Sequence, residues 1–192
     1  MIVYYDCEII RCIRPPGVSG DDLPAGIEYC AGFDDFANMG LACCCAIFDD
    51  GRLPRSYFSD NIREFQAEID AAELLVSYNG ISFDNPLLLA NGVIIPTYKC
   101  YDLLLEFKRA TGRRVKLDDL ARVNLGEAKS GDGANAPLLW QAGKRVEVVT
   151  YCLNDVRLLV KLYKLVECNR KLECPYTRTM VALQPAQAAL FR

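Results

Sequence analysis

Two closely spaced carboxylates lie near the start of the chain. Asp6 and Glu8 stand two residues apart in the apolar segment IVYYDCEII, which is typical of a buried strand. Residues two apart on a strand point to the same face, so both carboxylates face one side. Two like charges in a buried setting are costly unless a cation neutralises them, and oxygen ligands suit Mg²⁺ or Mn²⁺. The alternative is a pair at the solvated end of its strand that binds nothing.

A further acid lies on the apolar face of a long predicted helix at 144–168. At about 100° per residue, the apolar side chains of this segment form one broad stripe. Asp155 falls inside that stripe, and Tyr151 lies one turn earlier on the same side. An acid on a buried face requires a partner. That partner is either a metal ion or an arginine or lysine from elsewhere in the fold.

Asp84 stands in the segment YNGISFDNPLL, just before a predicted helix at 86–91. Pro86 suits the first turn of that helix, and either Asp84 or Asn85 could cap it. A capping role and a catalytic role for Asp84 are equally compatible with this segment taken alone.

The 192-residue sequence contains no histidine, and this narrows the possible chemistry. Histidine-dependent nucleophile pairs, HEXXH zinc proteases and a histidine general base are all excluded. A hydrolase must therefore rely on carboxylates, tyrosine, lysine or metal-bound water. The glycine motifs of P-loop and dinucleotide-binding enzymes are missing too. The net charge of −3 disfavours a protein that coats nucleic acid by charge alone, but not a nuclease whose metals supply local positive charge.

The termini, hydropathy and cysteines predict an intracellular, cytoplasmic protein without membrane contact. The N-terminus MIVYYDCE lacks a signal peptide's basic leader, and no apolar run is long enough to cross a bilayer. Ten cysteines favour a reducing compartment, because the consecutive Cys43–Cys45 cannot all form disulfides. No two cysteines have C-x-x-C spacing, so a zinc ribbon lacks its usual signature. Buried free thiols are the favoured interpretation.

The hydrophobic pattern predicts one α/β domain over residues 1–192, with a mixed sheet of about five strands flanked by helices. Strands are expected at 2–10, 40–48, 55–58, 73–78 and 97–101, and helices at 60–72, 86–91, 102–110, 117–124 and 144–168. Ser59 or Asp60 is expected to cap the helix at 60–72. The remaining segments are expected to be an irregular insertion or hairpin at 14–38, a glycine-rich loop at 129–137 and a C-terminal tail at 170–192 that is poorly defined after Pro175.

Taken together and in this order, the three acidic segments resemble a known family. D-x-E stands in YDCEI, N-G-x-x-F-D in NGISFDNPLL and Y-x-x-x-D in YCLNDVRLL. This resembles the tyrosine-bearing (DEDDy) branch of the DEDD exonucleases, whose fold is RNase H-like. The resemblance is to the 3′→5′ proofreading exonuclease domain of family B DNA polymerases and to stand-alone bacterial and viral relatives. It extends to about residue 165 and includes DLLLEFKRATGRRVKLDDLARVNLG, although the segment at 14–38 is longer than the family's usual first hairpin.

The resemblance implies a 3′→5′ exonuclease that hydrolyses phosphodiester bonds with two Mg²⁺ or Mn²⁺ ions, in DNA repair or replication. Asp6, Glu8 and Asp155 would hold the ion that lowers the pKa of the attacking water. Asp6 and Asp84 would hold the second ion, which stabilises the leaving 3′ oxygen. Tyr151 would orient the water, because a hydroxyl with a pKa near 10 suits positioning better than proton abstraction.

The expected partner is a nucleic acid with a free 3′ end, in single-stranded form. Asn79 and Phe83 are candidate substrate contacts beside the second motif, and Phe83 and Tyr78 could stack on a terminal base or pack in the core. Lys129, in the glycine-rich loop, is a candidate phosphate contact.

Four basic residues form a cluster between the second and third motifs: Arg109, Arg113, Arg114 and Lys116. They could contact phosphates or form a solvated helix end. Two other functions stay open: an endonuclease of the RNase H or resolvase kind, and a catalytically silent nucleic-acid-binding module. The tyrosine before Asp155 favours the exonuclease, and the complete set of acids disfavours the silent module.

Overall fold

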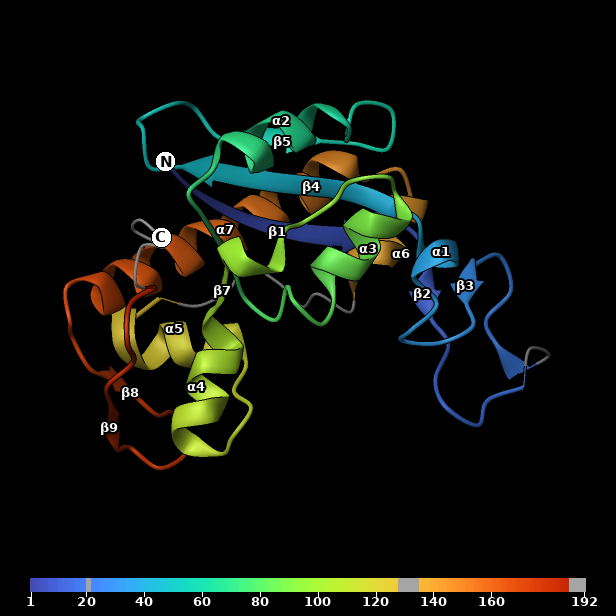
Figure 1. Ribbon diagram of the computed structural model, residues 1–192. Helices are drawn as coiled ribbons and strands as arrows, with labels where there is room; N and C mark the ends of the chain where they lie inside the picture. The colour runs from blue at the N-terminus through green and yellow to red at the C-terminus, as the bar shows by residue number, and fades with distance from the viewer. Residues whose placement is uncertain (20–21, 128–134, 187–192) are drawn as a thin grey trace.

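The computed structural model describes residues 1–19, 22–127 and 135–186, and a mixed sheet forms its centre (Figure 1). In sheet order the strands are β5 (Arg55–Tyr57), β4 (Leu41–Phe48), β1 (Ile2–Ile9), β6 (Leu74–Ser77) and β7 (Cys100–Asp102). β1 runs antiparallel to β4 and parallel to β6. The expected α/β fold with a five-stranded mixed sheet is therefore confirmed.

Helices cover both faces of this sheet. Among the described residues they are α1 (Phe36–Met39), α2 (Glu64–Ala71), α3 (Asp84–Ala90), α4 (Leu103–Thr111), α5 (Leu117–Leu125), α6 (Ala136–Gln141) and α7 (Arg145–Glu167). One core joins the sheet to α4, α5 and α7, and a second joins its other face to α2 and α3. β1 and β4 are thus buried on both sides, as their near-continuous apolar sequences predict.

Side chains of the central strands alternate between the two cores. Tyr4 packs with α7, whereas Val3 and Tyr5 face α2. In β4, Cys43 and Cys45 belong to the first core and Cys44 to the second. The period of two therefore decides which groups of β1 and β4 can meet α7. Within the described ranges, no helix has both the length and the hydropathy to cross a bilayer.

The helix expected at 60–72 is shorter than the pattern predicted. α2 begins at Glu64, and neither Ser59 nor Asp60 caps it, because residue 63 is its N-cap and makes no side-chain cap bond. The preceding residues form turns instead: the Asn61 carboxamide accepts the Phe58 N–H at 2.6 Å, and the Phe58 carbonyl accepts the Asn61 N–H at 3.0 Å. This local bonding replaces the first helical turn.

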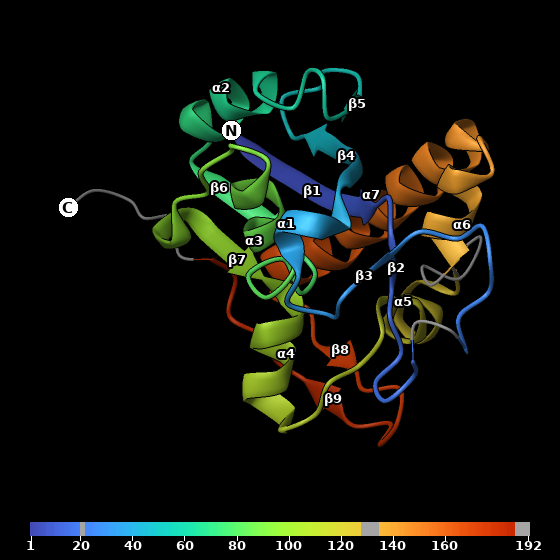
Figure 2. The same ribbon diagram turned by 90° about the vertical axis from the view of Figure 1, so that its right-hand side faces the viewer.

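The segment at 14–38 is neither irregular throughout nor a hairpin. Its residues Tyr29–Cys30 form β3, which pairs in parallel with β2 (Cys12–Ile13). Hydrogen bonds of Gln141, in α6, connect this segment to the end of β1. Its side chain accepts the Glu28 N–H at 2.8 Å and donates to the carbonyls of Ile10 and Glu28 at 2.9 and 3.1 Å. Figure 2 shows β2 and β3 beside α6.

The described part of the tail is also ordered, contrary to expectation. β8 (Leu172–Glu173) and β9 (Met180–Val181) form an antiparallel pair. The Asn124 side chain bonds both the N–H and the carbonyl of Glu173, which ties the pair to α5. The described residues of the predicted loop at 129–137 lie at the start of α6. The strand expected at 97–101 is shorter, because a 3₁₀ turn at Thr97–Lys99 precedes β7.

Candidate active site

One pocket of about 430 Å³ collects all the acids that sequence reasoning selected. β1 contributes Asp6 and Glu8, α3 contributes Asp84, and α7 contributes Tyr151 and Asp155. Three segments far apart in the sequence thus meet at one end of the sheet. Such a concentration of acids in a concave site is typical of divalent metal binding.

Asp6 and Glu8 share the face of β1 that meets α7. Glu8 is 8% exposed and Asp6 is half-buried. Each offers a carboxylate oxygen within 4.8 Å of the other's and of the Cys152 thiol. The pair therefore does not lie at a fully solvated strand end. The pairing of β1 with β4 shifts just after Glu8, a bulge of the kind that re-aims side chains beside active sites.

Asp84 is the most deeply buried of the β1 and α3 acids, at 3% exposure. Its Oδ1 accepts the N–H of Cys7 at 2.7 Å, which places it beside the Asp6 backbone. Burial raises the pKa of Asp84 to about 7, against the lowering effect of that hydrogen bond. A nearby cation would stabilise the ionised form of such a buried carboxyl group. Neither Asp84 nor Asn85 caps α3, because Phe83 is its N-cap and makes no side-chain cap bond; Asn85 accepts the Tyr5 hydroxyl instead. Of the two roles left open for Asp84, capping is therefore excluded.

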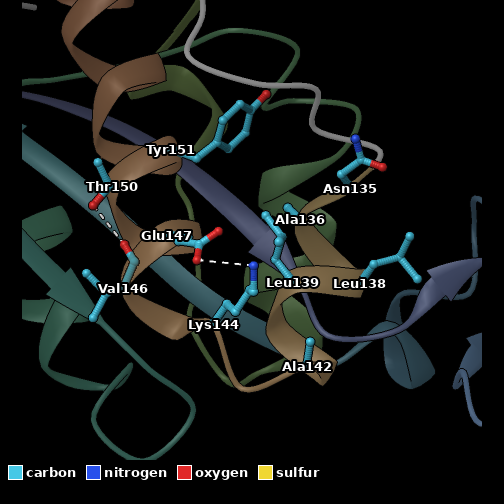
Figure 3. Close-up of a pocket in the computed structure, with 10 residues that line it drawn as sticks. All are labelled: Asn135, Ala136, Leu138, Leu139, Ala142, Lys144, Val146, Glu147, Thr150 and Tyr151. Atoms are coloured by element: carbon cyan, nitrogen blue, oxygen red, sulfur yellow. Dashed lines mark hydrogen bonds and ion pairs between the residues drawn. The ribbon is translucent and has the colours of Figure 1, made fainter.

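α7 carries Tyr151 and Asp155 on its buried face, as the helical period predicted, with exposures of 8% and 4%. Tyr151 also lines a second cavity of about 750 Å³ between α6 and the start of α7 (Figure 3). In that cavity Lys144 forms an ion pair with Glu147 at 3.4 Å. Tyr151 therefore stands between the acidic pocket and an adjoining, largely apolar hollow.

The loop before Asp84 is held by a buried acid that sequence reasoning missed. Asp102, 2% exposed, accepts the N–H groups of Asn79 at 2.9 Å and Ile81 at 3.1 Å. The same carboxylate caps α4 through Leu104 N–H at 3.0 Å. Gly80 is required in this loop, because a Cβ there would lie 2.3 Å from the Ser77 hydroxyl oxygen. An acid at the expected start of a helix was the only signal for Asp102 in the sequence.

An aromatic group from the segment at 14–38 also lines the pocket and was not foreseen. The Phe33 ring is 51% exposed, and its centroid lies 5.2 Å from that of Phe83. Phe36 also packs against Phe83, with its ring centroid 5.9 Å from that of Phe83. Tyr78 also lines the pocket, but its hydroxyl donates to the Val115 carbonyl at 2.8 Å, which fixes it against the core.

The four basic residues do not act as one group. Arg114 donates to the Asn79 side chain at 2.9 Å and so reaches the pocket's edge. Arg109 pairs with Glu106 on the surface of α4, and Arg113 lines a separate hollow beside β9. Lys116 is exposed at the start of α5. Lys129, the other basic candidate, lies outside the described residues.

A family model for the RNase H superfamily matches residues 41–167. The chain belongs to the RNase H superfamily. The matched range includes Asp84, Tyr151 and Asp155, and the fold is typical of hydrolytic nucleases that use divalent metal ions and act on nucleic acids.

Solved structures agree on the fold. The structure of the family B DNA polymerase from the hyperthermophilic archaeon Pyrobaculum calidifontis is similar with a TM-score of 0.61 and 18% identity, over 86% of this chain and 24% of that chain. This chain therefore spans about a quarter of the polymerase chain's length. At this identity the similarity concerns the fold alone. A search of curated proteins finds no match.

Proposed function

We propose that this member of the RNase H superfamily is a DEDDy-type 3′→5′ exonuclease that uses two Mg²⁺ or Mn²⁺ ions. The observation that carries the proposal is the single pocket in which Asp6, Glu8, Asp84 and Asp155 lie together with Tyr151. The order of these groups along the chain, two on the first strand and a tyrosine four residues before the last acid, favours this activity over that of an endonuclease on the same fold.

The acids fit divalent cations by their chemistry. Their ligand atoms are all carboxylate oxygens, which suit Mg²⁺ and Mn²⁺, and several like charges gathered in one largely buried pocket are costly to keep ionised. Asp6, Glu8 and Asp155 would hold one ion, and Asp6 and Asp84 would hold the other. Bound ions of this kind lower the pKa of a water molecule and offset charge on the scissile phosphate. Because burial raises the pKa of Asp84, a cation bound beside it would favour the ionised form of this carboxyl.

Tyr151 acts by position. Tyr151 lies on the buried face of α7 one turn before Asp155, and it lines the acidic pocket. There it orients the attacking water by a hydrogen bond and excludes other water orientations.

The substrate end is held by aromatic and polar groups. Phe33 and Phe83 present a paired aromatic surface at the pocket, on which the terminal base of a single strand stacks. Asn79 and Arg114, which bond each other at 2.9 Å, supply donors for a phosphate or base edge. Because the net charge is −3, affinity comes from the bound cations and these few groups.

The proposal also covers the domain organisation, the compartment and the pathway. Residues 1–192 act as one domain in a reducing, cytoplasmic compartment, and the activity serves DNA repair or replication. All ten cysteines are thiols in the structure, which suits such a compartment.

A comparison of end-labelled linear strands with circular strands tests the activity. We expect stepwise shortening of linear single-stranded DNA or RNA from the 3′ end in Mg²⁺, no cleavage of circles, and no cleavage in excess chelator. Asp155→Asn should abolish the reaction. Asp70→Asn is the matched control, because Asp70 is exposed on α2, on the opposite face of the sheet. Cleavage of circles would establish the endonuclease, and metal-dependent binding without cleavage would establish the silent module.

A further inference from the structure

Three cysteines from two elements converge beside the acidic pocket. Cys43 and Cys45 share one face of β4, and Cys152 faces them from α7. All three are fully buried, and their sulfur atoms lie within 4.8 Å of one another. Cys44, between the first two, points into the other core. This group, called the thiol cluster below, is the only all-cysteine group of this kind within the described ranges.

The strand register sets the thiol cluster directly against the acids. In the β1–β4 pair, Asp6 stands opposite Cys45 and Glu8 stands opposite Cys43. Directly opposed residues on one face have Cβ atoms about 4.5–5.5 Å apart. Cys152 approaches these two residue pairs from α7. Its thiol donates to the Asp6 carbonyl at 3.3 Å and lies 3.7 Å from Asp6 Oδ2. Cys152 therefore belongs both to the thiol cluster and to the group formed with Asp6 and Glu8.

We propose that Cys43, Cys45 and Cys152, with one carboxylate oxygen of Asp6 or Glu8, form a binding site for a thiophilic divalent cation, Zn²⁺. Zinc prefers four ligands in a tetrahedron and binds thiolate sulfur at about 2.3 Å, which sets sulfur atoms about 3.8 Å apart. Sulfurs already within 4.8 Å reach that spacing by side-chain adjustments of about 1 Å or less. Mg²⁺ has no affinity for sulfur, so the thiol cluster selects the softer ion.

Surrounding groups fit a thiolate site. The Ser56 hydroxyl lies 3.4 Å from the Cys45 sulfur, so it can donate to a bound thiolate. Zinc binds the thiolate form of each cysteine, so any proton that a thiol still carries passes to the medium on binding. The site has C-x-C spacing on a strand and its third sulfur 107 positions later, so the usual C-x-x-C signature cannot reveal it.

Occupation of the thiol cluster has a consequence for catalysis that rests on the proposed function. A carboxylate oxygen of Asp6 or Glu8 would coordinate a zinc ion bound there. The Cys152 thiol would then no longer donate to the Asp6 carbonyl. Both acids belong to the proposed Mg²⁺ site, so the two ions compete. The thiol cluster thereby makes the enzyme sensitive to free zinc.

Direct binding to the reduced, metal-free protein tests the site without any nuclease assay. Cd²⁺ is the probe, because its thiolate complexes absorb in the ultraviolet, and Zn²⁺ is then added as a competitor. We expect the thiolate band to saturate at one Cd²⁺ per chain, to have the strength given by three thiolates, and to be lost on addition of Zn²⁺. Absence of a stoichiometric thiolate band in the wild-type protein overturns the proposal, whatever the variants do.

Single serine substitutions assign the ligands. Cys43→Ser and Cys45→Ser should each lower Cd²⁺ affinity by more than about a hundredfold, because even outer-shell partners are worth about 10–100-fold. Cys44→Ser is the matched control: it changes the adjacent, equally buried thiol on the other face and should keep full affinity. Equal loss in Cys44→Ser, or no loss in either of the other two folded variants, overturns the assignment.

A second arm separates this site from the proposed function. With Mg²⁺ present, equimolar Zn²⁺ should lower wild-type hydrolysis strongly, and Cys45→Ser should keep a larger fraction of its own zinc-free rate. If the protein binds Cd²⁺ as described but never hydrolyses nucleic acid, the proposed function fails and the site stands. If it hydrolyses nucleic acid but gives no thiolate band, the site fails and the function stands.

Discussion

Replacing Asp84 by asparagine should stabilise the metal-free protein at alkaline pH. The Asp84 carboxyl is almost fully buried, and its Oδ1 accepts a hydrogen bond from the Cys7 N–H. Ionising it in that setting is costly, which is why burial raises its pKa to about 7 from an ordinary value of 3.8. Asparagine has the same shape, still accepts the Cys7 N–H through its oxygen, and never carries the charge.

The size and sign of the effect follow from linkage. In the unfolded chain Asp84 ionises near pH 4, whereas in the folded protein it ionises near pH 7. The folded state therefore loses stability as pH rises between these values, and the asparagine variant does not. A tenfold change in an acid constant corresponds to about 1.4 kcal/mol, so the variant gains at most about 4 kcal/mol above pH 7 and nothing below pH 4.

Urea unfolding in chelator at pH 4, 6 and 8 measures this gain. Asp70→Asn, which removes an exposed acid from α2, should show a much smaller and nearly pH-independent change. Saturating Mg²⁺ at pH 8 should stabilise the wild type more than Asp84→Asn, because only the wild type keeps the full ligand set. A gain that is absent at pH 8, or equal at all three pH values, would refute the argument that burial holds this carboxyl neutral.

Three further substitutions follow from the contacts in the pocket. Tyr151→Phe should lower the single-turnover rate by about 10²–10⁴-fold with little change in substrate affinity, and an unchanged rate would remove the tyrosine from the mechanism. Phe33→Ala should weaken binding of a single strand by about 1–3 kcal/mol, as measured by fluorescence titration, since base stacking is lost; equal affinity would exclude the aromatic pair as a base platform. Arg114→Gln should reduce the slope of log affinity against log salt concentration by about 0.7. Arg109→Gln, which removes a surface ion pair on α4, should leave this slope unchanged. The opposite ranking would contradict the placement of Arg114 at the pocket.

The parts of the fold that could be predicted are those with long, regular hydrophobic patterns. β1 and β4 have near-continuous apolar sequences, and α7 has a broad stripe, so their type and their buried faces followed from periodicity alone. The same periods put Asp6 beside Glu8 and Tyr151 beside Asp155. Periodicity shows which residues share a face, and the meeting of these faces in one pocket comes from the pairing order of the sheet.

The features that could not be predicted depend on contacts between distant segments. β2 and β3 have two residues each, too few to show a period, and they are held by a glutamine more than a hundred positions away. Phe33 therefore gave no sign that it lines the pocket. Asp102 had the pattern of an ordinary helix cap, and its bonds to the loop before Asp84 arise only because β7 lies beside β6. The thiol cluster depends on the packing of α7 against β4.

The pocket itself offers the most direct test of the account. Crystals grown without divalent cations and then equilibrated with Mn²⁺ would show bound manganese by its anomalous scattering. We predict two ions about 3.5–4 Å apart, the first held by Asp6, Glu8 and Asp155 and the second by Asp6 and Asp84. A pocket that takes up no manganese at saturating concentration, or ions held by other residues, would contradict the two-metal active site.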